Sequence, residues 1–130
     1  MLGWEYQVTV HELPESLARK EGTAFECDQD GLCFVAEAEG KIVGFNLARE
    51  LYVGIPLSKI CVIQGIVVHD DYRRLGIGEK LVQAVLEHCV KHNIEAVRAL
   101  VYEGDTRLQQ FAEFLGFRRS MVANFDKVIA

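Results

Sequence analysis

A glycine-containing turn between a strand-like segment and a helix-like segment is the part of this sequence best suited to chemistry. It runs from His69 to Gly78 and follows the apolar stretch Ile60–Val68. At the start of a helix several backbone N–H groups have no acceptor, and the helix dipole adds partial positive charge. Glycines let an anion approach that backbone closely, and Arg73 and Arg74 add two full charges. These residue types predict a binding site for a diphosphate group.

Two common phosphate-binding motifs do not match this turn. A Rossmann motif would need a third glycine where Leu81 stands. A Walker loop would need Gly-Lys-Ser/Thr, whereas Glu79 follows Gly78. A third interpretation needs no ligand, because a glycine turn can serve only to let a helix pack on a sheet.

The spacing Arg73-x-x-Gly76-x-Gly78 resembles the Arg/Gln-x-x-Gly-x-Gly/Ala coenzyme A motif of the GNAT N-acetyltransferase superfamily. The flanking residues extend the resemblance, which covers about residues 32–117. They are Val68-His69-x-x-Tyr72 before the turn, an amphipathic helix after it, and the late motif Phe111-x-x-x-Leu115-Gly116-Phe117.

The resemblance implies a contact surface for acetyl-CoA that runs from the strand into the helix. The strand residues would face the pantetheine arm, which can pair with strand backbone, and an N–H near Val68 would bind the thioester oxygen. Backbone N–H groups of residues 75–80 would hold the pyrophosphate. The implied cofactor-binding residues are Ile66, Val67, Val68, Arg73, Arg74, Leu75, Gly76, Ile77, Gly78, Glu79 and Lys80.

The general base and general acid of many relatives have no counterpart in this sequence. Where such relatives have a Glu on the central strand and a Tyr on the last helix, the matching positions hold Gln64 and Ala112. Tyr102 and Glu103, which follow a predicted strand, are the candidate replacements. Their ordinary interpretation is an amphipathic sheet residue and a solvated carboxylate. Further candidates are Asp105, Tyr52 and His69.

The resemblance therefore implies an enzyme that moves an acetyl group from acetyl-CoA to a primary amine of a small molecule or a protein. The missing base and acid leave an alternative open, a non-catalytic sensor or subunit that binds coenzyme A or an acyl-CoA. A third possibility is a domain used only for protein association. The segment of residues 125–130 could pair across a homodimer, and a net charge of −5 favours a cationic acceptor.

The histidines and cysteines predict no metal site. His88 and His92 lie four residues apart, but Cys89 stands where a zincin helix needs a glutamate, so we expect them to complement the helix dipole. The four cysteines form no Cys-x-x-Cys pair. We therefore expect Cys61 and Cys89, which lie in apolar segments, to be reduced core residues, no disulfide framework, and a cytoplasmic protein.

Composition excludes several other classes. The chain has 130 residues, half of them apolar and a quarter charged, as in a soluble globular domain. The acidic net charge argues against a nucleic-acid coat. The longest nearly apolar run, Ile60–Val68, is far shorter than the roughly 20 residues of a membrane span.

The hydrophobic pattern predicts one α/β (α+β) domain over residues 1–130, with a mixed, mostly antiparallel sheet flanked by helices on both faces. Compared with the family, residues 11–31 leave a shortened N-terminal helical region and an open acceptor cleft. We expect a hairpin turn at Glu39-Gly40 and a bulge at Gly65. The expected strands are Tyr6–Val10, Leu32–Ala38, Lys41–Tyr52, Ile60–Val68, Ala96–Tyr102, Phe117–Val122 and Phe125–Ile129; the expected helices are Glu12–Lys20, Glu79–His92 with Asn93 as C-cap, and one between Thr106 as N-cap and Gly116 as C-cap.

Overall fold

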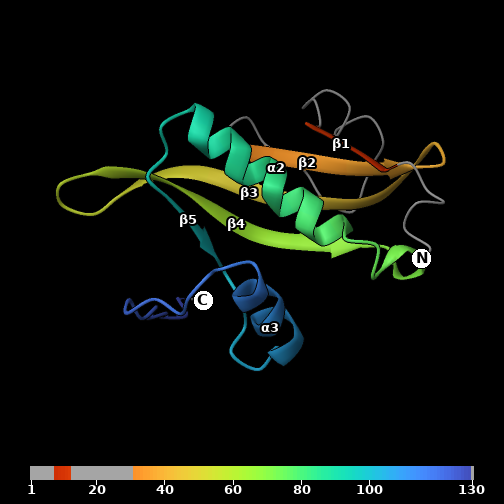
Figure 1. Ribbon diagram of the computed structural model, residues 1–130. Coiled ribbons are helices and arrows are strands. Elements are labelled where there is room, and N and C mark those ends of the chain that lie inside the picture. Colours follow the sequence, from red (N-terminus) through yellow and green to blue (C-terminus); the bar gives the residue numbers. More distant parts are fainter. Residues whose placement is uncertain (1–7, 13–30, 130) are drawn as a thin grey trace. The chain divides into compact units, whose positions relative to one another are not determined.

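The computed structural model describes residues 8–12 and 31–129, which form two compact units on either side of the Leu100–Val101 bond (Figure 1). Each unit is described by itself. The first holds β1 (Val8–Glu12), β2 (Gly31–Ala38), β3 (Lys41–Val53), β4 (Ser58–Val68), the short 3₁₀ helix η2 (Asp70–Tyr72), α2 (Ile77–Lys91) and β5 (Ala96–Ala99), and the second holds α3 (Thr106–Phe114).

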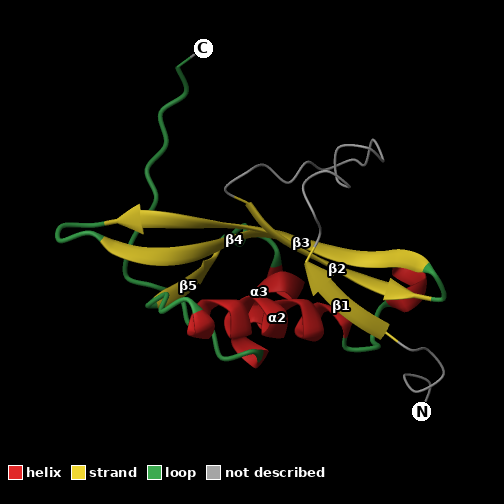
Figure 2. Ribbon diagram, turned by 90° about the horizontal axis from the view of Figure 1, so that it is seen from above, coloured by secondary structure: helices red, strands yellow, loops and turns green. Residues whose placement is uncertain are grey.

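The first unit is a five-stranded sheet with the strand order β1-β2-β3-β4-β5 (Figure 2). Neighbouring strands from β1 to β4 are antiparallel, whereas β4 and β5 are parallel and are joined through α2. A parallel pair needs such a crossover, because a tight turn can join only antiparallel strands. The mixed, mostly antiparallel sheet confirms the predicted fold class.

The turn between β2 and β3 follows from its two residues. Glu39 and Gly40 have φ angles of 54° and 74°. Positive φ at both positions is what a two-residue hairpin turn of type I′ requires, and its twist matches that of the strands it joins. The turn predicted at Glu39-Gly40 is confirmed.

β4 is the central strand of the site. Ile60, Cys61, Val62 and Ile63 are all buried, as their uninterrupted apolar run predicts. The register with β3 then shifts, because Leu47 lies opposite Gly65 and Ala48 opposite Ile63. Gln64 is thus the extra residue of a β-bulge, one position before the predicted site.

Helix α2 covers one face of this sheet with a continuous apolar stripe. Ile77 and Leu81 are buried against Ala36, Ala38 and Val43 of β2 and β3. A second cluster, formed by Cys33 and Val35 with Phe45 and Leu47 packed against them, lies on the other face, because successive strand residues point to opposite sides.

The helix boundaries differ from the prediction for local reasons. α2 begins at Ile77 rather than Glu79, because Gly76 takes the N-cap position with φ 76°. It ends at Lys91, and Asn93 follows in the left-handed region with φ 56°, one residue beyond the C-cap His92. The predicted capping box of α3 is wrong by one residue, because the Asp105 carboxylate, not Thr106, accepts from the Leu108 N–H at 3.0 Å.

The strand predictions after α2 differ from the structure. β5 stops at Ala99 instead of Tyr102, because β4 offers it no further pairing beyond Ile63. The predicted strands Phe117–Val122 and Phe125–Ile129 are wrong, since residues 117–129 form no strand in the described part of the chain. Their alternating pattern needs a pairing partner, and pairing across a homodimer stays a prediction.

At the N-terminal end, the strand that was expected at Tyr6–Val10 is described as Val8–Glu12. The predicted helix Glu12–Lys20 lies almost wholly outside the described residues, as does the segment that would open the acceptor cleft. In the described parts of the chain, no helix combines the length and the apolar character needed to cross a membrane.

The contact between β3 and α2 predicts a strong effect of one glycine. A Cβ at Gly44 would lie 3.1 Å from both Ile77 Cγ2 and the Val67 carbonyl oxygen, which belongs to the ladder and cannot move freely. Gly44→Ala should therefore lower the free energy of unfolding in urea by about 1–3 kcal/mol.

The matched control is Gly65→Ala, because a Cβ there would meet nothing within 4 Å. Its free energy of unfolding should change by less than about 1 kcal/mol. An equal loss in both variants would show that the approach of α2 is not the cause.

Candidate functional site

The turn after β4 ends at an uncapped helix N-terminus. Gly76 is the N-cap and has no side chain to accept a hydrogen bond. The first helical bond runs from the Lys80 N–H to the Gly76 carbonyl at 3.0 Å. The N–H groups of Ile77, Gly78 and Glu79 precede that bond and have no acceptor in the described parts of the chain. Free N–H groups at a helix start are the arrangement that can bind an anion, as the sequence predicts for this turn.

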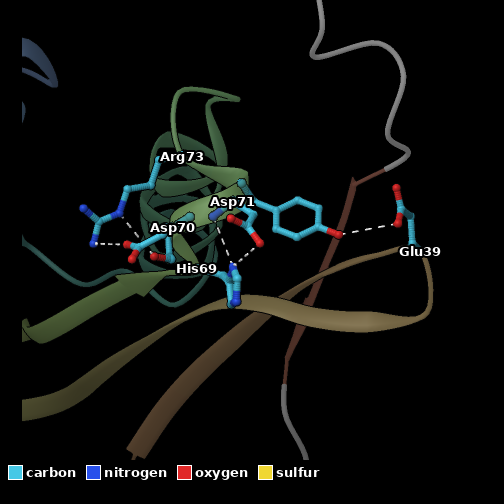
Figure 3. A network of polar contacts seen from close by, with 7 residues as sticks. Glu39, His69, Asp70, Asp71 and Arg73 are labelled. Carbon is cyan, nitrogen blue, oxygen red and sulfur yellow. Dashed lines mark hydrogen bonds and ion pairs between the residues drawn. The ribbon is translucent and has the colours of Figure 1, made fainter.

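Polar contacts within the turn hold its shape (Figure 3). The Asp71 N–H donates to His69 Nδ1 at 3.2 Å, and the Arg73 guanidinium pairs with Asp70 Oδ1 at 3.1 Å. The Tyr72 hydroxyl donates to Glu39 Oε2 at 3.5 Å, which links the turn to the β2–β3 hairpin. The turn is thus held by contacts among its own residues and by one contact with the β2–β3 hairpin.

Formal charges around the turn balance one another. The cations predicted to attract phosphate are Arg73, Arg74 and Lys80, and three carboxylates, those of Asp70, Asp71 and Glu79, lie in the same segment. A general excess of positive charge therefore does not define the site. Attraction for an anion must come from the free N–H groups and from individual cations that have no nearby carboxylate.

β4 has an open edge beside this turn. Its pairing with β5 covers only Ile60–Ile63, and the last bond on that side runs from the Leu100 N–H to the Ile63 carbonyl at 3.1 Å. β5 ends at Ala99, so within the described part of the first unit no strand pairs with this side of β4 after Ile63. The bulge at Gln64 lies at the point where the pairing with β5 ends.

The backbone groups at the open edge can be identified from the ladder. The His69 N–H donates to the Val43 carbonyl at 2.8 Å, and Val67 lies opposite Phe45. In an antiparallel ladder the direction of these groups alternates, so Ile66 and Val68 point their N–H and C=O groups away from β3. An extended ligand can pair with this edge as an added strand does and can place an anionic end at the start of α2.

The cofactor-binding residues predicted from the sequence all lie in one stretch of the first unit, from the end of β4 to the start of α2, with the Ile77 side chain buried in the core. Ile66–Val68 lie at the open edge, residues 73–76 form the turn, and residues 77–80 are the first turn of α2. The comparison with protein families is decisive at this point. A model described as the acetyltransferase (GNAT) family matches residues 3–117. The chain belongs to this family.

Solved structures of similar fold include several acetyltransferases. An aminoglycoside acetyltransferase, meta-AAC0020 from an uncultured soil metagenomic sample, has 20% identity and a TM-score of 0.78, with 95% of this chain and 97% of that chain covered. The aminoglycoside N-acetyltransferase AAC(6')-Iy in complex with CoA has 16% identity and a TM-score of 0.78, with 96% and 97% covered. The ribosomal-protein-alanine N-acetyltransferase of Brucella melitensis biovar Abortus 2308 has 14% identity and a TM-score of 0.79, with 94% and 100% covered.

The candidate catalytic residues Tyr102 and Glu103 belong to the second unit. Both backbone carbonyls accept hydrogen bonds from the Gln109 side-chain amide. The Tyr102 side chain is 89% exposed, and the Glu103 carboxylate lies 3.5 Å from the Arg119 guanidinium. The segment before α3 thus has an anchored backbone and solvent-accessible side chains. The candidate Asp105 is occupied as the N-cap of α3.

The two positions that the resemblance aligns with a base and an acid lie in different units. Gln64 is the exposed bulge residue of β4 in the first unit, and Ala112 lies on α3 in the second. The structure therefore brings together the predicted cofactor residues, whereas it describes the catalytic candidates separately. Sequence reasoning missed Asp70 as the partner of Arg73, although their spacing of three residues could have indicated it.

The C-terminal half of α2 contains an ion-pair cluster that the sequence did not predict. Glu50 Oε1 lies 2.9 Å from His88 Nε2, and Glu50 Oε2 lies 3.2 Å from Lys59 Nζ. The His88 and His92 rings stack with centroids 4.1 Å apart. The hydrogen bond from His88 lowers the pKa of Glu50, and Lys59 contributes in the same direction. In the described residues no group of three or more ligating side chains could hold a metal ion.

The described cysteines differ in whether they form a disulfide bond. Cys61 and Cys89 are free and buried, as predicted. Burial raises the pKa of Cys61 to about 12 and also raises that of Cys89, so neither is a reactive thiolate at neutral pH. The sequence predicted no disulfide, whereas Cys33 is disulfide-bonded. Cys33 is buried. The Cys-x-x-Cys pattern identifies only cysteines that are close together in the sequence.

The Glu50 cluster predicts a pH dependence of stability. Because the folded pKa of Glu50 lies below its ordinary value of 4.5, its contribution is present above that pH and is lost as the pH falls through the folded pKa. Glu50→Gln should lower the free energy of unfolding at neutral pH by about 0.5–1 kcal/mol. The difference from the wild type should be smaller at an acidic pH below 4.5 than at neutral pH, because the folded carboxylate takes up its proton as the pH falls.

Urea unfolding at the two pH values measures this difference, with Glu87→Gln as a control on the exposed side of α2. A loss that persists at the acidic pH would contradict an ionic origin.

Proposed function

We propose that this protein is an N-acetyltransferase that moves the acetyl group of acetyl-CoA to a primary amine. One observation carries the proposal, namely that the open edge of β4 leads directly into the uncapped start of α2. This combination offers strand pairing to an extended amide-containing arm and free N–H groups to a diphosphate. Membership of the acetyltransferase family supports it, as does the fold shared with an enzyme that was solved with CoA.

In this proposal the pantetheine arm lies along Ile66–Val68, and the pyrophosphate binds the backbone N–H groups from Leu75 to Glu79. The Lys80 N–H already donates to the Gly76 carbonyl, so Lys80 contributes only its side-chain charge. A backbone N–H near Val68 stabilises the oxygen of the thioester as it becomes negative. The neutral amine nitrogen attacks the thioester carbon, the carbon–sulfur bond breaks, and the departing thiolate takes up a proton. The amine loses one proton, so that the reaction is balanced.

We assign the two proton transfers to the second unit. Glu103 is the candidate base and Tyr102 the candidate acid, because both side chains are accessible and their backbone is anchored by Gln109. This assignment requires the two units to act as one domain over residues 1–130. The acceptor is an amine of a small molecule or a protein. Similar folds occur in enzymes named for aminoglycosides and for ribosomal-protein alanine.

A second candidate function rests on Gln64 and Ala112. A carboxamide cannot accept a proton at neutral pH, and a methyl group cannot donate one. If Tyr102 and Glu103 do not replace the missing groups, the protein is a coenzyme A or acyl-CoA sensor or subunit. The two functions differ in turnover and not in cofactor binding.

Cofactor binding can be tested at the N-cap of α2. Gly76→Asp places a carboxylate at the anion site, so the affinity for CoA in calorimetry should fall at least about 30-fold, equivalent to about 2 kcal/mol. The control Gly54→Asp makes the same change at a glycine with a similar φ of 83°, next to the β3–β4 turn. It should leave CoA affinity unchanged. Equal affinity of the Gly76 variant and the wild type would refute the proposed site.

Turnover can be tested by thiol release from acetyl-CoA with a panel of amines. We expect at least one amine to be acetylated, and Tyr102→Phe and Glu103→Gln each to lower kcat by about 10²–10⁴-fold while the Kd for CoA is unchanged. Glu113→Gln, an exposed carboxylate on α3, is the control. Tight CoA binding without turnover of any amine would establish the sensor instead.

A further inference from the structure

One glutamine side chain closes the turn that precedes α3. Nε2 of Gln109 donates to the Tyr102 carbonyl at 3.1 Å and also to the Glu103 carbonyl. The backbone N–H of Gln109 donates to the Asp105 carbonyl at 3.0 Å. Gln109 is therefore bound to the turn through both its backbone and its side chain, and it joins the first helical turn of α3 to residues 102–105.

Two neighbouring carbonyl groups meet at this one nitrogen atom. In an extended strand successive carbonyl groups point in opposite directions, so a single donor cannot reach both. The backbone is therefore bent at Glu103, in agreement with the turn at residues 103–104. The Tyr102 carbonyl also accepts from the Asp105 N–H at 3.0 Å. The strand alternation that would place the side chains of Tyr102 and Glu103 on opposite faces is thus interrupted.

The backbone of these two residues is held, whereas their side chains stay accessible. The Tyr102 side chain is 89% exposed. The Glu103 carboxylate lies 3.5 Å from the Arg119 guanidinium, and both groups are largely exposed to solvent. A proton-transfer group needs this combination, because its backbone determines which atoms the side chain can reach and the side chain must meet the substrate.

We propose that Gln109 is a positioning residue for Tyr102 and Glu103. Its carboxamide holds both carbonyls, so that the phenol and the carboxylate are presented by one bent segment. This inference rests on the proposed function, because it presupposes that these two side chains transfer the protons. A small displacement of a catalytic group lowers the rate of the chemical step, so the role of Gln109 belongs in kcat rather than in cofactor binding.

The next residue of α3 provides a matched control. Gln110 is also a glutamine, but its side chain is exposed and makes no hydrogen bond in the part of the chain that the structure describes. Methionine is similar to glutamine in length and helix propensity and has no N–H to donate. In the thiol-release assay Gln109→Met should lower kcat about 10- to 100-fold, while the Kd for CoA in calorimetry stays within about twofold. Gln110→Met should change neither quantity.

A double variant separates positioning from a general loss of structure. If Gln109 acts through Glu103, Gln109→Met should lower kcat by a smaller factor when Glu103→Gln is already present, because the group to be positioned is gone. Independent effects would multiply instead. Thermal melts of each variant without ligand check that the fold is retained.

Hydrogen exchange of the Asp105 amide tests the contact without turnover. This N–H donates to the Tyr102 carbonyl, which the Gln109 side chain also holds. The amide should therefore exchange at least about threefold faster in Gln109→Met than in the wild type. Its exchange in Gln110→Met should match the wild type.

Several results would overturn this inference. Unchanged exchange of the Asp105 amide would show that Gln109 does not hold the turn. Faster exchange with an unchanged kcat, or an equal factor in the Glu103→Gln background, would show that its role is structural alone. A wild-type protein that acetylates no amine would overturn the proposed function, and this inference with it, whereas wild-type turnover that Gln109→Met leaves intact overturns this inference alone.

Discussion

β4 has a hydrogen-bonding neighbour on one side from Ser58 to Val68, apart from the bulge at Gln64, and loses the neighbour on its other side after Ile63. The end of this parallel pairing leaves one side of β4 without a strand neighbour within the described part of the first unit, and the candidate site is built on that side. Backbone N–H and C=O groups strongly require partners, so an open edge in the middle of a sheet predisposes the structure to bind an extended molecule. The bulge contributes, because an extra residue bends its strand at the place where the pairing with β5 ends.

β4 is also the strand that leads, through the turn, to the start of α2. β4 ends at Val68 against β3, and within ten residues the chain forms a 3₁₀ turn, two left-handed residues and the uncapped helix start. The position of α2 over β3 depends on the absence of a side chain at Gly44, where a Cβ would meet Ile77. The helix start is thus held at a fixed distance from the open edge. The charges of the segment balance, so the geometry of N–H groups carries more of the anion preference than net charge does.

Much of this arrangement could be predicted from the sequence. The strands from Leu32 to Val68, the hairpin turn at Glu39-Gly40 and the bulge follow from local patterns of apolar, glycine and β-branched residues. The family resemblance rested on Arg73-x-x-Gly76-x-Gly78 and its flanks, and the family match bears it out. The predicted strands Phe117–Val122 and Phe125–Ile129 were wrong, because an alternating pattern indicates a capacity to pair but does not provide a partner strand. The disulfide bond of Cys33 was not predicted, because a disulfide joins residues that are brought together only by folding.

The sequence by itself determined the strand–glycine turn–helix segment and, through it, the family, because glycine spacing and a following amphipathic helix are local properties of the chain. It also showed that Gln64 and Ala112 lack the usual proton-transfer groups. Only the tertiary structure decided how Arg73 is engaged, since its contacts depend on where the end of β4 places the Val68 carbonyl. It likewise decided where the pairing of β4 with β5 ends. Strand pairing is a contact between distant segments, and no local pattern encodes the point at which it ends.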